Sequence, residues 1–285
     1  MPVFGPAGSP QSFFDRGYKK TEQMPAYLKE IGLTAFEYQC GRGVNIKADK
    51  AQLLGERCRE AGIAVSLHAP YYISLSGTDE AKRLKSLDYI LQSAEAVNHM
   101  GGNRIVVHTG SASKITREQA MSLAADTVLR ALRHLDEHGL GSVHICLETM
   151  GKVGQLGTLD EVIELCRLDD RLLPCTDFGH LNARTLGGLS EYRDFEAVFD
   201  AIEDRLGENR MRVMHVHFSK IAYTQAGEKM HLTFEDTEYG PEFGPVAELS
   251  VKKHCHPVFI CESAGTQAED ALTMMRIYES LRHMQ

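Results

Sequence analysis

The sequence predicts a (β/α)8 barrel, or TIM barrel, from its length and from the order of its periodic segments. Its 285 residues suit one such barrel, which takes about 250 residues before insertions. Short apolar runs of β type alternate with amphipathic segments of helical period, and eight such pairs are present. Eight strands in this length favour closure into a barrel over an open sheet. We therefore expect one domain covering residues 1–285.

Each expected strand is a short run that ends at turn residues or at the start of a helical pattern. The eight runs are Val3–Pro6, Ala35–Gln39, Ala64–Leu67, Arg104–Val107, Val143–Leu147, Leu172–Thr176, Arg212–Val216 and Pro257–Cys261. Four helical segments stop at a glycine just before a strand, as helices with a left-handed residue after the last turn do. These glycines are Gly32, Gly62, Gly101 and Gly139.

Three kinds of local pattern predict the helices. A helix is expected near Glu22–Ile31, and the segment Ala81–Met100 repeats leucine, alanine and valine at helical spacing. The pairs Thr116 with Gln119 and Thr158 with Glu161 have the spacing of capping boxes, so each predicts a helix start.

Composition excludes several classes of protein. Hydrophobic residues make up 43% and charged residues 25% of the chain, and the formal net charge is −8, as in an ordinary globular protein without a generally basic surface. No apolar run is long enough to cross a membrane, and the start lacks a signal peptide pattern. Seven scattered cysteines without a CxxC motif argue against a disulfide framework. We expect a cytoplasmic monomer with reduced thiols.

Metal-ligand residue types follow six consecutive expected strands. In a TIM barrel the C-terminal strand ends meet at one mouth, so these side chains are expected to converge. Crowded carboxylates and imidazoles are tolerated mainly when a cation neutralises them. A metal centre with more than one ion is therefore predicted. The residues at the strand ends are His68, His108, Glu148, Asp177, His215 with His217, and Glu262.

The sequence resembles the endonuclease IV family of zinc-dependent apurinic/apyrimidinic endonucleases, within the xylose isomerase-like barrels. The resemblance covers nearly the whole chain. It rests on six stretches: His68–Leu75, Val107–Gly110, Leu147–Thr149, Thr176–His180, Met214–Lys220 and Cys261–Ser263. It implies hydrolysis of DNA on the 5′ side of abasic sites, in base-excision repair, with two zinc ions, although manganese also suits the residue types.

The resemblance also implies ligand roles. His68 and His108 would hold one zinc, Glu148 would bridge it to a second, and Asp177, His215 and Glu262 would complete the second. His180 and His231 would hold a third. Glu148 and Glu262 would also take part in catalysis. Glu262 would act mainly as a metal ligand and secondarily as a base that orients or deprotonates the water. His217 shares a strand face with His215, so it is expected to point inward as well. His217 could either bind the metal directly or form a hydrogen bond to a residue that does.

Lys229 departs from the family pattern. The family has an aspartate two residues before the last histidine, but here that position is Lys229. We therefore expect a third metal site that is weakly occupied or empty, with Lys229 placing its charge near the scissile phosphate. The alternative is that Lys229 points to solvent and Glu228 supplies the carboxylate.

Three loop residues are expected to contact DNA. Arg42, Tyr71 and Tyr72 follow strands on the ligand side, and their positions resemble the family's groove-reading residues. Arginine can follow phosphates and tyrosine can stack into the gap left by a missing base.

Two other functions remain open at this point. A sugar isomerase or 3-epimerase of the same superfamily would use one metal on a set resembling Glu148, Asp177, His215 and Glu262, and would leave His68, His108 and His231 without a task. A barrel that binds metal or DNA without catalysis is the third hypothesis.

Overall fold

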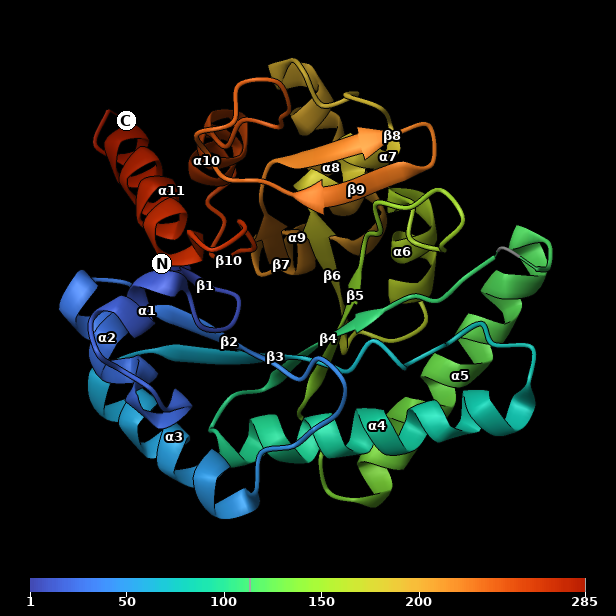
Figure 1. Ribbon diagram of the computed structural model, residues 1–285. Helices are drawn as coiled ribbons and strands as arrows, with labels where there is room; N and C mark the ends of the chain where they lie inside the picture. The colour runs from blue at the N-terminus through green and yellow to red at the C-terminus, as the bar shows by residue number, and fades with distance from the viewer. Residues whose placement is uncertain (113, 285) are drawn as a thin grey trace.

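The predicted fold class is confirmed by a nearly closed barrel of eight parallel strands (Figure 1). The structure is a computed structural model that describes residues 1–112 and 114–284. The strands follow one another in the order β1-β10-β7-β6-β5-β4-β3-β2. Their bounds are β1 Val3–Pro6, β2 Ala35–Gln39, β3 Ala64–His68, β4 Arg104–His108, β5 His144–Glu148, β6 Leu172–Asp177, β7 His215–Phe218 and β10 Val258–Cys261.

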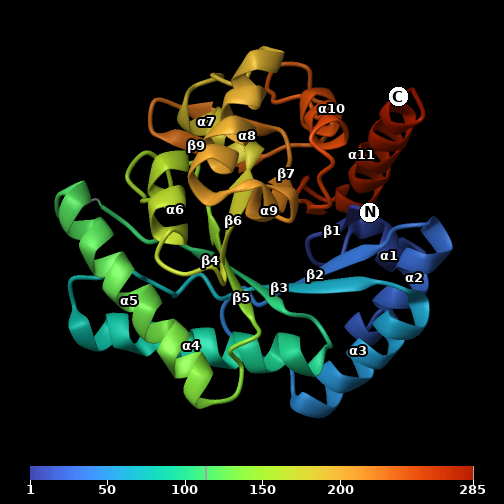
Figure 2. The ribbon, with the colours of Figure 1, turned by 180° about the vertical axis from the view of Figure 1, so that it is seen from behind.

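Helices surround the barrel on its outer side, as the view from behind shows (Figure 2). They bury a continuous apolar core between themselves and the strands. Their bounds are α1 Gln11–Asp15, α2 Met24–Ile31, α3 Ala48–Ala61, α4 Glu80–His99, α5 Arg117–Glu137, α6 Leu159–Cys166, α7 Phe178–Arg184, α8 Tyr192–Leu206, α9 Glu208–Arg212, α10 Gly244–Lys252 and α11 Gln267–Arg282, with a 3-10 turn at Thr21–Gln23. Among the described residues, no helix has both the length and the apolar character to cross a membrane.

The barrel closes where β1 and β2 approach each other. The backbone N–H of Gly8 donates to the Glu37 carbonyl over 2.9 Å, and Ala7 forms a parallel bridge with Glu37. A side chain at Gly5 would place its Cβ only 1.8 Å from the Ala35 carbonyl oxygen. Glycine at this position therefore lets the two strands come together.

Local sequence signals are confirmed for helix ends and starts. Gly32, Gly62, Gly101 and Gly139 all adopt positive φ angles, between 70° and 87°. Thr116 and Thr158 both form the expected capping boxes with Gln119 and Glu161. All seven cysteines are buried and free.

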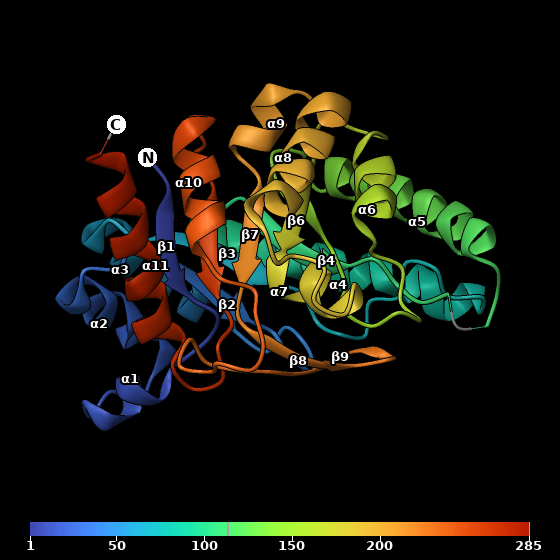
Figure 3. The same ribbon diagram turned by 90° about the horizontal axis from the view of Figure 1, so that it is seen from above.

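Strand β7 begins three residues later than expected, at His215. The preceding residues Glu208–Arg212 form helix α9, where Arg212 pairs with Glu208 one turn earlier at 2.5 Å. A small antiparallel hairpin, β8 Ile221–Thr224 with β9 Gly227–His231, was also not expected from the sequence. This hairpin begins three residues after β7 ends and packs against α7, so it lies at the C-terminal rim of the barrel (Figure 3).

Alternate residues of each strand face the interior of the barrel. Val106, Cys146 and Leu173 form a buried apolar cluster in the interior of strands β4, β5 and β6. The C-terminal end carries the imidazoles and carboxylates that the sequence singled out.

Candidate metal centre

Three groups of potential ligand atoms gather at the C-terminal end of the barrel. Within each group the ligand atoms lie no more than 4.8 Å apart. Glu148 belongs to two of the groups, so these two groups have one carboxylate in common. The groups are His68 with His108 and Glu148; Glu148 with Asp177, His217 and Glu262; and His180 with Glu228 and His231.

A pocket of about 430 Å³ opens over these groups. The loop that forms one wall is held by Arg184, which donates hydrogen bonds to the carbonyls of Met150, Lys152, Val153 and Gln155. The lining residues are Gln39, His68, Tyr71, His108, Glu148, Met150, Lys152, Gln155, His180, Glu228, His231 and Glu262.

Glu148 is the central carboxylate of the pocket floor, with 1% of its side chain exposed. Its Oε2 lies 3.3 Å from His68 Nε2 and 3.2 Å from His108 Nε2. Its Oε1 lies 3.3 Å from both His217 Nδ1 and His180 Nδ1. Burial alone would raise the pKa of Glu148, but the surrounding histidines, His108 foremost, hold it well below the usual value. The residue is therefore a carboxylate that faces imidazoles from two sides.

Three of the pocket histidines are oriented by a contact of their Nδ1 atom with a neutral group. His68 Nδ1 lies 2.8 Å from the Ala69 carbonyl oxygen and His180 Nδ1 lies 3.0 Å from that of Thr149. His231 Nδ1 lies 2.8 Å from the Ser219 hydroxyl. Donation from Nδ1 to the two carbonyl oxygens fixes the tautomer of His68 and His180 in which Nε2 carries the lone pair, as in metal-ligating histidines.

The crowding of acids provides a test of whether the site suits a cation. Burial raises the pKa of Asp177 to about 6 against the opposing charge of His180, and Glu262 and Glu148 add to the increase. Asp177 Oδ2 is buried and makes no hydrogen bond to the described residues, although His180 Nδ1 lies 3.1 Å away. A divalent cation would satisfy this oxygen and offset the repulsion. The residues present therefore fit a metal centre.

His217, and not His215, lies in the group with Glu148, Asp177 and Glu262, which differs from the ligand role that the resemblance gave to His215. The strand register explains the difference. His217 is level with Asp177 on β6, whereas His215 is level with Cys175, one layer deeper in the barrel. His215 is fully buried there, and its Nε2 lies 2.9 Å from a Glu37 carboxylate oxygen.

Lys229 is exposed and does not line the pocket, whereas Glu228 does. A one-residue bulge in the hairpin accounts for this. Ala222 pairs with Met230 but Tyr223 pairs with Glu228, so Lys229 is an extra residue on β9. The extra residue reverses the facing of the chain before it, so Glu228 and His231 share a face although they are three apart.

Glu228 thereby reaches the group that the sequence left short of a carboxylate. Its Oε2 lies 3.4 Å from His180 Nε2. Gly151 allows the approach, because a Cβ there would lie 2.6 Å from the Glu228 Cβ and 2.9 Å from His180 Cδ2. The structure thus agrees with the alternative interpretation: Lys229 faces solvent, and Glu228 is the carboxylate beside His180 and His231.

The three loop residues expected to contact DNA all lie on the pocket side. Tyr71 is 58% exposed, lines the pocket and stacks near His108 with ring centroids 6.4 Å apart. Arg42 is exposed in the neighbouring loop, where the Gly41 carbonyl accepts a hydrogen bond from Tyr71 N. Tyr72 faces a second groove of about 360 Å³ that Lys82 and Lys114 also line.

Sequence reasoning missed two residues of the site, Glu37 and Gln39. Glu37 and Gln39 face the barrel interior from β2, and the alternation of polar residues in Glu37-Tyr38-Gln39 is the signal that could have found them. Gln39 lines the pocket and donates a 3.1 Å hydrogen bond to Glu37.

Comparison with known proteins identifies the family of the barrel. A family described as the xylose isomerase-like TIM barrel matches residues 25–276. The chain belongs to this family. Within it, an uncharacterized protein of Methanocaldococcus jannaschii is 32% identical over 281 residues, which cover 99% of this chain and 98% of that protein. A probable endonuclease 4 of Acholeplasma laidlawii is 29% identical over 170 residues, and this match spans 57% of the chain and 56% of that relative.

Solved structures of xylose isomerase-like barrels share the fold at low sequence identity. A D-tagatose 3-epimerase-like protein superposes with a TM-score of 0.72 at 19% identity, covering 99% of this chain and 97% of that one. Endonuclease IV from Thermus thermophilus superposes with a TM-score of 0.69 at 19% identity, covering both chains completely. These likenesses establish the architecture and leave the reaction to be argued from the site.

Proposed function

We propose that this xylose isomerase-like barrel is a metal-dependent phosphodiester hydrolase that cleaves DNA on the 5′ side of abasic sites. One observation carries the proposal: three groups of donors surround a single pocket, and two of them share Glu148. Carboxylate oxygens and imidazole nitrogens without thiolate suit Zn²⁺ and also Mn²⁺. When bound, such cations supply Lewis acidity, which acidifies water and offsets the charge of a phosphodiester.

The side chains around the metal groups suit a polynucleotide. Glu262 is 15% exposed at the pocket wall, where it can accept a proton from water in addition to its place beside His217. Tyr71 offers an exposed ring for stacking against the unpaired site. The chain has a net negative charge, but positive side chains lie near the pocket and could bind phosphates. They are Lys152 at the pocket and Lys82 and Lys114 along the second groove.

A sugar isomerase or 3-epimerase is the second candidate. The group of Glu148, Asp177, His217 and Glu262 resembles that enzyme class once His217 replaces His215 in the set. Two carboxylates in one group can shuttle a proton beside a polarised carbonyl. This candidate gives no task to His68, His108, His180, Glu228 and His231, which is why we favour the hydrolase.

The deciding experiment is strand cleavage of a duplex with a single abasic site, with and without a chelator, beside a ketose-isomerisation assay. We expect metal-dependent cleavage 5′ to the lesion that leaves a 3′-hydroxyl. Ketose conversion without cleavage would support the epimerase instead. An unsaturated aldehyde end would point to β-elimination by an amine, and Lys152 is the amine at the pocket rim.

Glu228 is expected to hold a third metal ion with His180 and His231. Replacing Glu228 with glutamine removes the charge at the same size, so we expect the metal content to fall by one ion per chain. Lys229→Gln is the matched control, because the neighbouring side chain is exposed and should leave the content unchanged. Metal analysis after dialysis measures both, and loss of the ion in the Lys229 variant alone would contradict the bulge argument.

Zinc affinity is expected to rise as pH increases from about 6 to about 8. Burial by itself would lower the pKa of His68. The contact with Glu148 and the negative charges of Glu148, Glu37 and Glu262 outweigh burial and raise the pKa of His68 to about 8. Below that pH the metal-free ring carries a proton that must leave before Nε2 can bind metal. Competition with a chromogenic chelator across this range measures the trend, and a flat profile would contradict it.

A further inference from the structure

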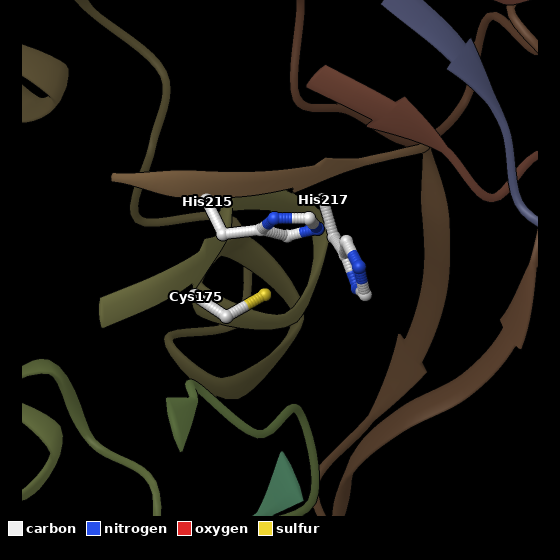
Figure 4. Close-up of side chains that lie close together, drawn as sticks. All are labelled: Cys175, His215 and His217. Atoms are coloured by element: carbon white, nitrogen blue, oxygen red, sulfur yellow. The ribbon is translucent and has the colours of Figure 1, made fainter. Parts of the chain in front are cut away.

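A fully buried carboxylate lies directly beneath the metal centre. Glu37 faces the barrel interior from the middle of β2 and does not line the pocket, so it cannot touch a substrate. Its Oε1 lies 3.0 Å from His217 Nε2, and its Oε2 lies 2.9 Å from both His215 Nε2 and the Ser66 hydroxyl. Figure 4 shows how close together His215 and His217 lie, with the Cys175 sulfur beside them.

His217 stands between this carboxylate and the metal centre. Its Nδ1 faces upward, 3.3 Å from Glu148 and 3.5 Å from Glu262, while its Nε2 faces down toward Glu37. The contact with Glu37 is an ion pair by distance and lacks the alignment of a regular hydrogen bond. A negative charge 3.0 Å from Nε2 favours the tautomer with its proton there, which leaves the Nδ1 lone pair for a metal ion.

This arrangement differs from that of the other pocket histidines. Ala69, Thr149 and Ser219 contact His68, His180 and His231 through neutral oxygen atoms, and the carboxylates nearest these rings, such as Asp177 beside His180, belong to the three groups themselves. Among the histidines of the three groups, within the described part of the chain, His217 is the one that contacts a carboxylate lying outside those groups. A carboxylate behind a ligating histidine fixes the ring and increases its basicity toward the metal.

We propose that Glu37 is a positioning residue that holds His217 for metal binding through Nδ1 and strengthens the metal centre from below. His215 and Ser66 brace the Glu37 carboxylate by their contacts with Oε2. This explains why a second histidine occurs two residues before the ligand on the same strand face. The inference rests on the metal centre of the proposed function.

Zinc binding to Glu37→Gln tests the proposal. Purified protein is stripped of metal, and its zinc affinity is measured by competition with a chromogenic chelator. We expect the variant to bind zinc about 10- to 100-fold more weakly than the wild type. Glu235→Gln is the control, because Glu235 is exposed and lies outside the three ligand groups, so its zinc affinity should match the wild type.

Thermal unfolding of the metal-free proteins separates positioning from a merely structural role. A Glu37→Gln protein that is less stable but binds zinc with wild-type affinity would overturn the proposal. Glu37→Asp keeps the negative charge but moves it away from the His217 ring. Its zinc affinity should therefore lie between those of the wild type and Glu37→Gln. This variant replaces Glu37→Gln in the test if the glutamine variant does not fold. A wild-type protein without zinc affinity would overturn the metal centre itself, whereas a zinc-binding wild type with an unaffected variant would overturn only the role of Glu37.

Discussion

Replacing Glu148 with glutamine is expected to lower metal content and to reduce the cleavage rate by at least about a hundredfold. The two oxygens of Glu148 face different sets of histidines, Oε2 toward His68 and His108 and Oε1 toward His180 and His217. An amide presents one oxygen and one N–H₂ group, so it can serve one of these sides and repels a cation on the other. Both adjoining metal positions should therefore weaken together.

Metal analysis and the abasic-site assay measure the two effects of this substitution. Glu235→Gln is the control, since Glu235 is exposed and lies outside the three ligand groups. A Glu148→Gln protein that keeps its metal and its rate would rule out a bridging role. Retention of metal with loss of rate would place Glu148 in the chemical step alone.

Substitution of His217 by asparagine is expected to remove metal from the group with Asp177 and Glu262 and to reduce cleavage by a factor similar to that of Glu148→Gln. Asparagine offers at most an amide oxygen near the position of Nδ1, 3.3 Å from Glu148 and 3.5 Å from Glu262, and an amide oxygen binds zinc more weakly than an imidazole nitrogen. The same change at His215 should retain much more metal, because His215 lies one layer deeper, beside Cys175 and Glu37.

The comparison of the two histidine variants decides between the observed register and the alignment suggested by sequence. Metal content per chain and zinc affinity are the measurements. His215→Asn losing its metal while His217→Asn keeps it would reverse the ligand assignment. Thermal unfolding of the metal-free proteins accompanies both, because each side chain is fully buried.

Local chemistry explains which parts of the fold the sequence predicted. The strands Val3–Pro6 and Ala35–Gln39 have the expected bounds, because turn residues and a helix-ending glycine flank the short β-type runs. The capping boxes at Thr116 and Thr158 formed because their hydrogen bonds join residues three apart. Signals of this range need no knowledge of the rest of the molecule.

The errors arose where a distant partner decides the outcome. The start of β7 was misplaced because Arg210 and Arg212 complete helix α9, with Arg210 donating to the Cys166 carbonyl 44 residues away. Lys229 was expected near the substrate, but it is the extra residue of a bulge that exists only in the pairing of β9 with β8. The role of Glu37 depends on β2 facing β7 across the barrel, which spacing along the chain does not reveal.

In the proposed metal centre, binding of a third cation would be coupled to opening of the hairpin at the rim. Glu228 and His231 belong to the hairpin, whereas His180 belongs to α7, so a shared ion would join His180 to residues 48 and 51 positions later in the chain. A ligand that binds the closed arrangement stabilises it in proportion to the logarithm of its concentration. Opening of the hairpin, and the rate at which its amide hydrogens exchange with water, should therefore depend on free metal, while the barrel strands beneath remain protected. In the proposed metal centre, the third ion would hold the hairpin against α7.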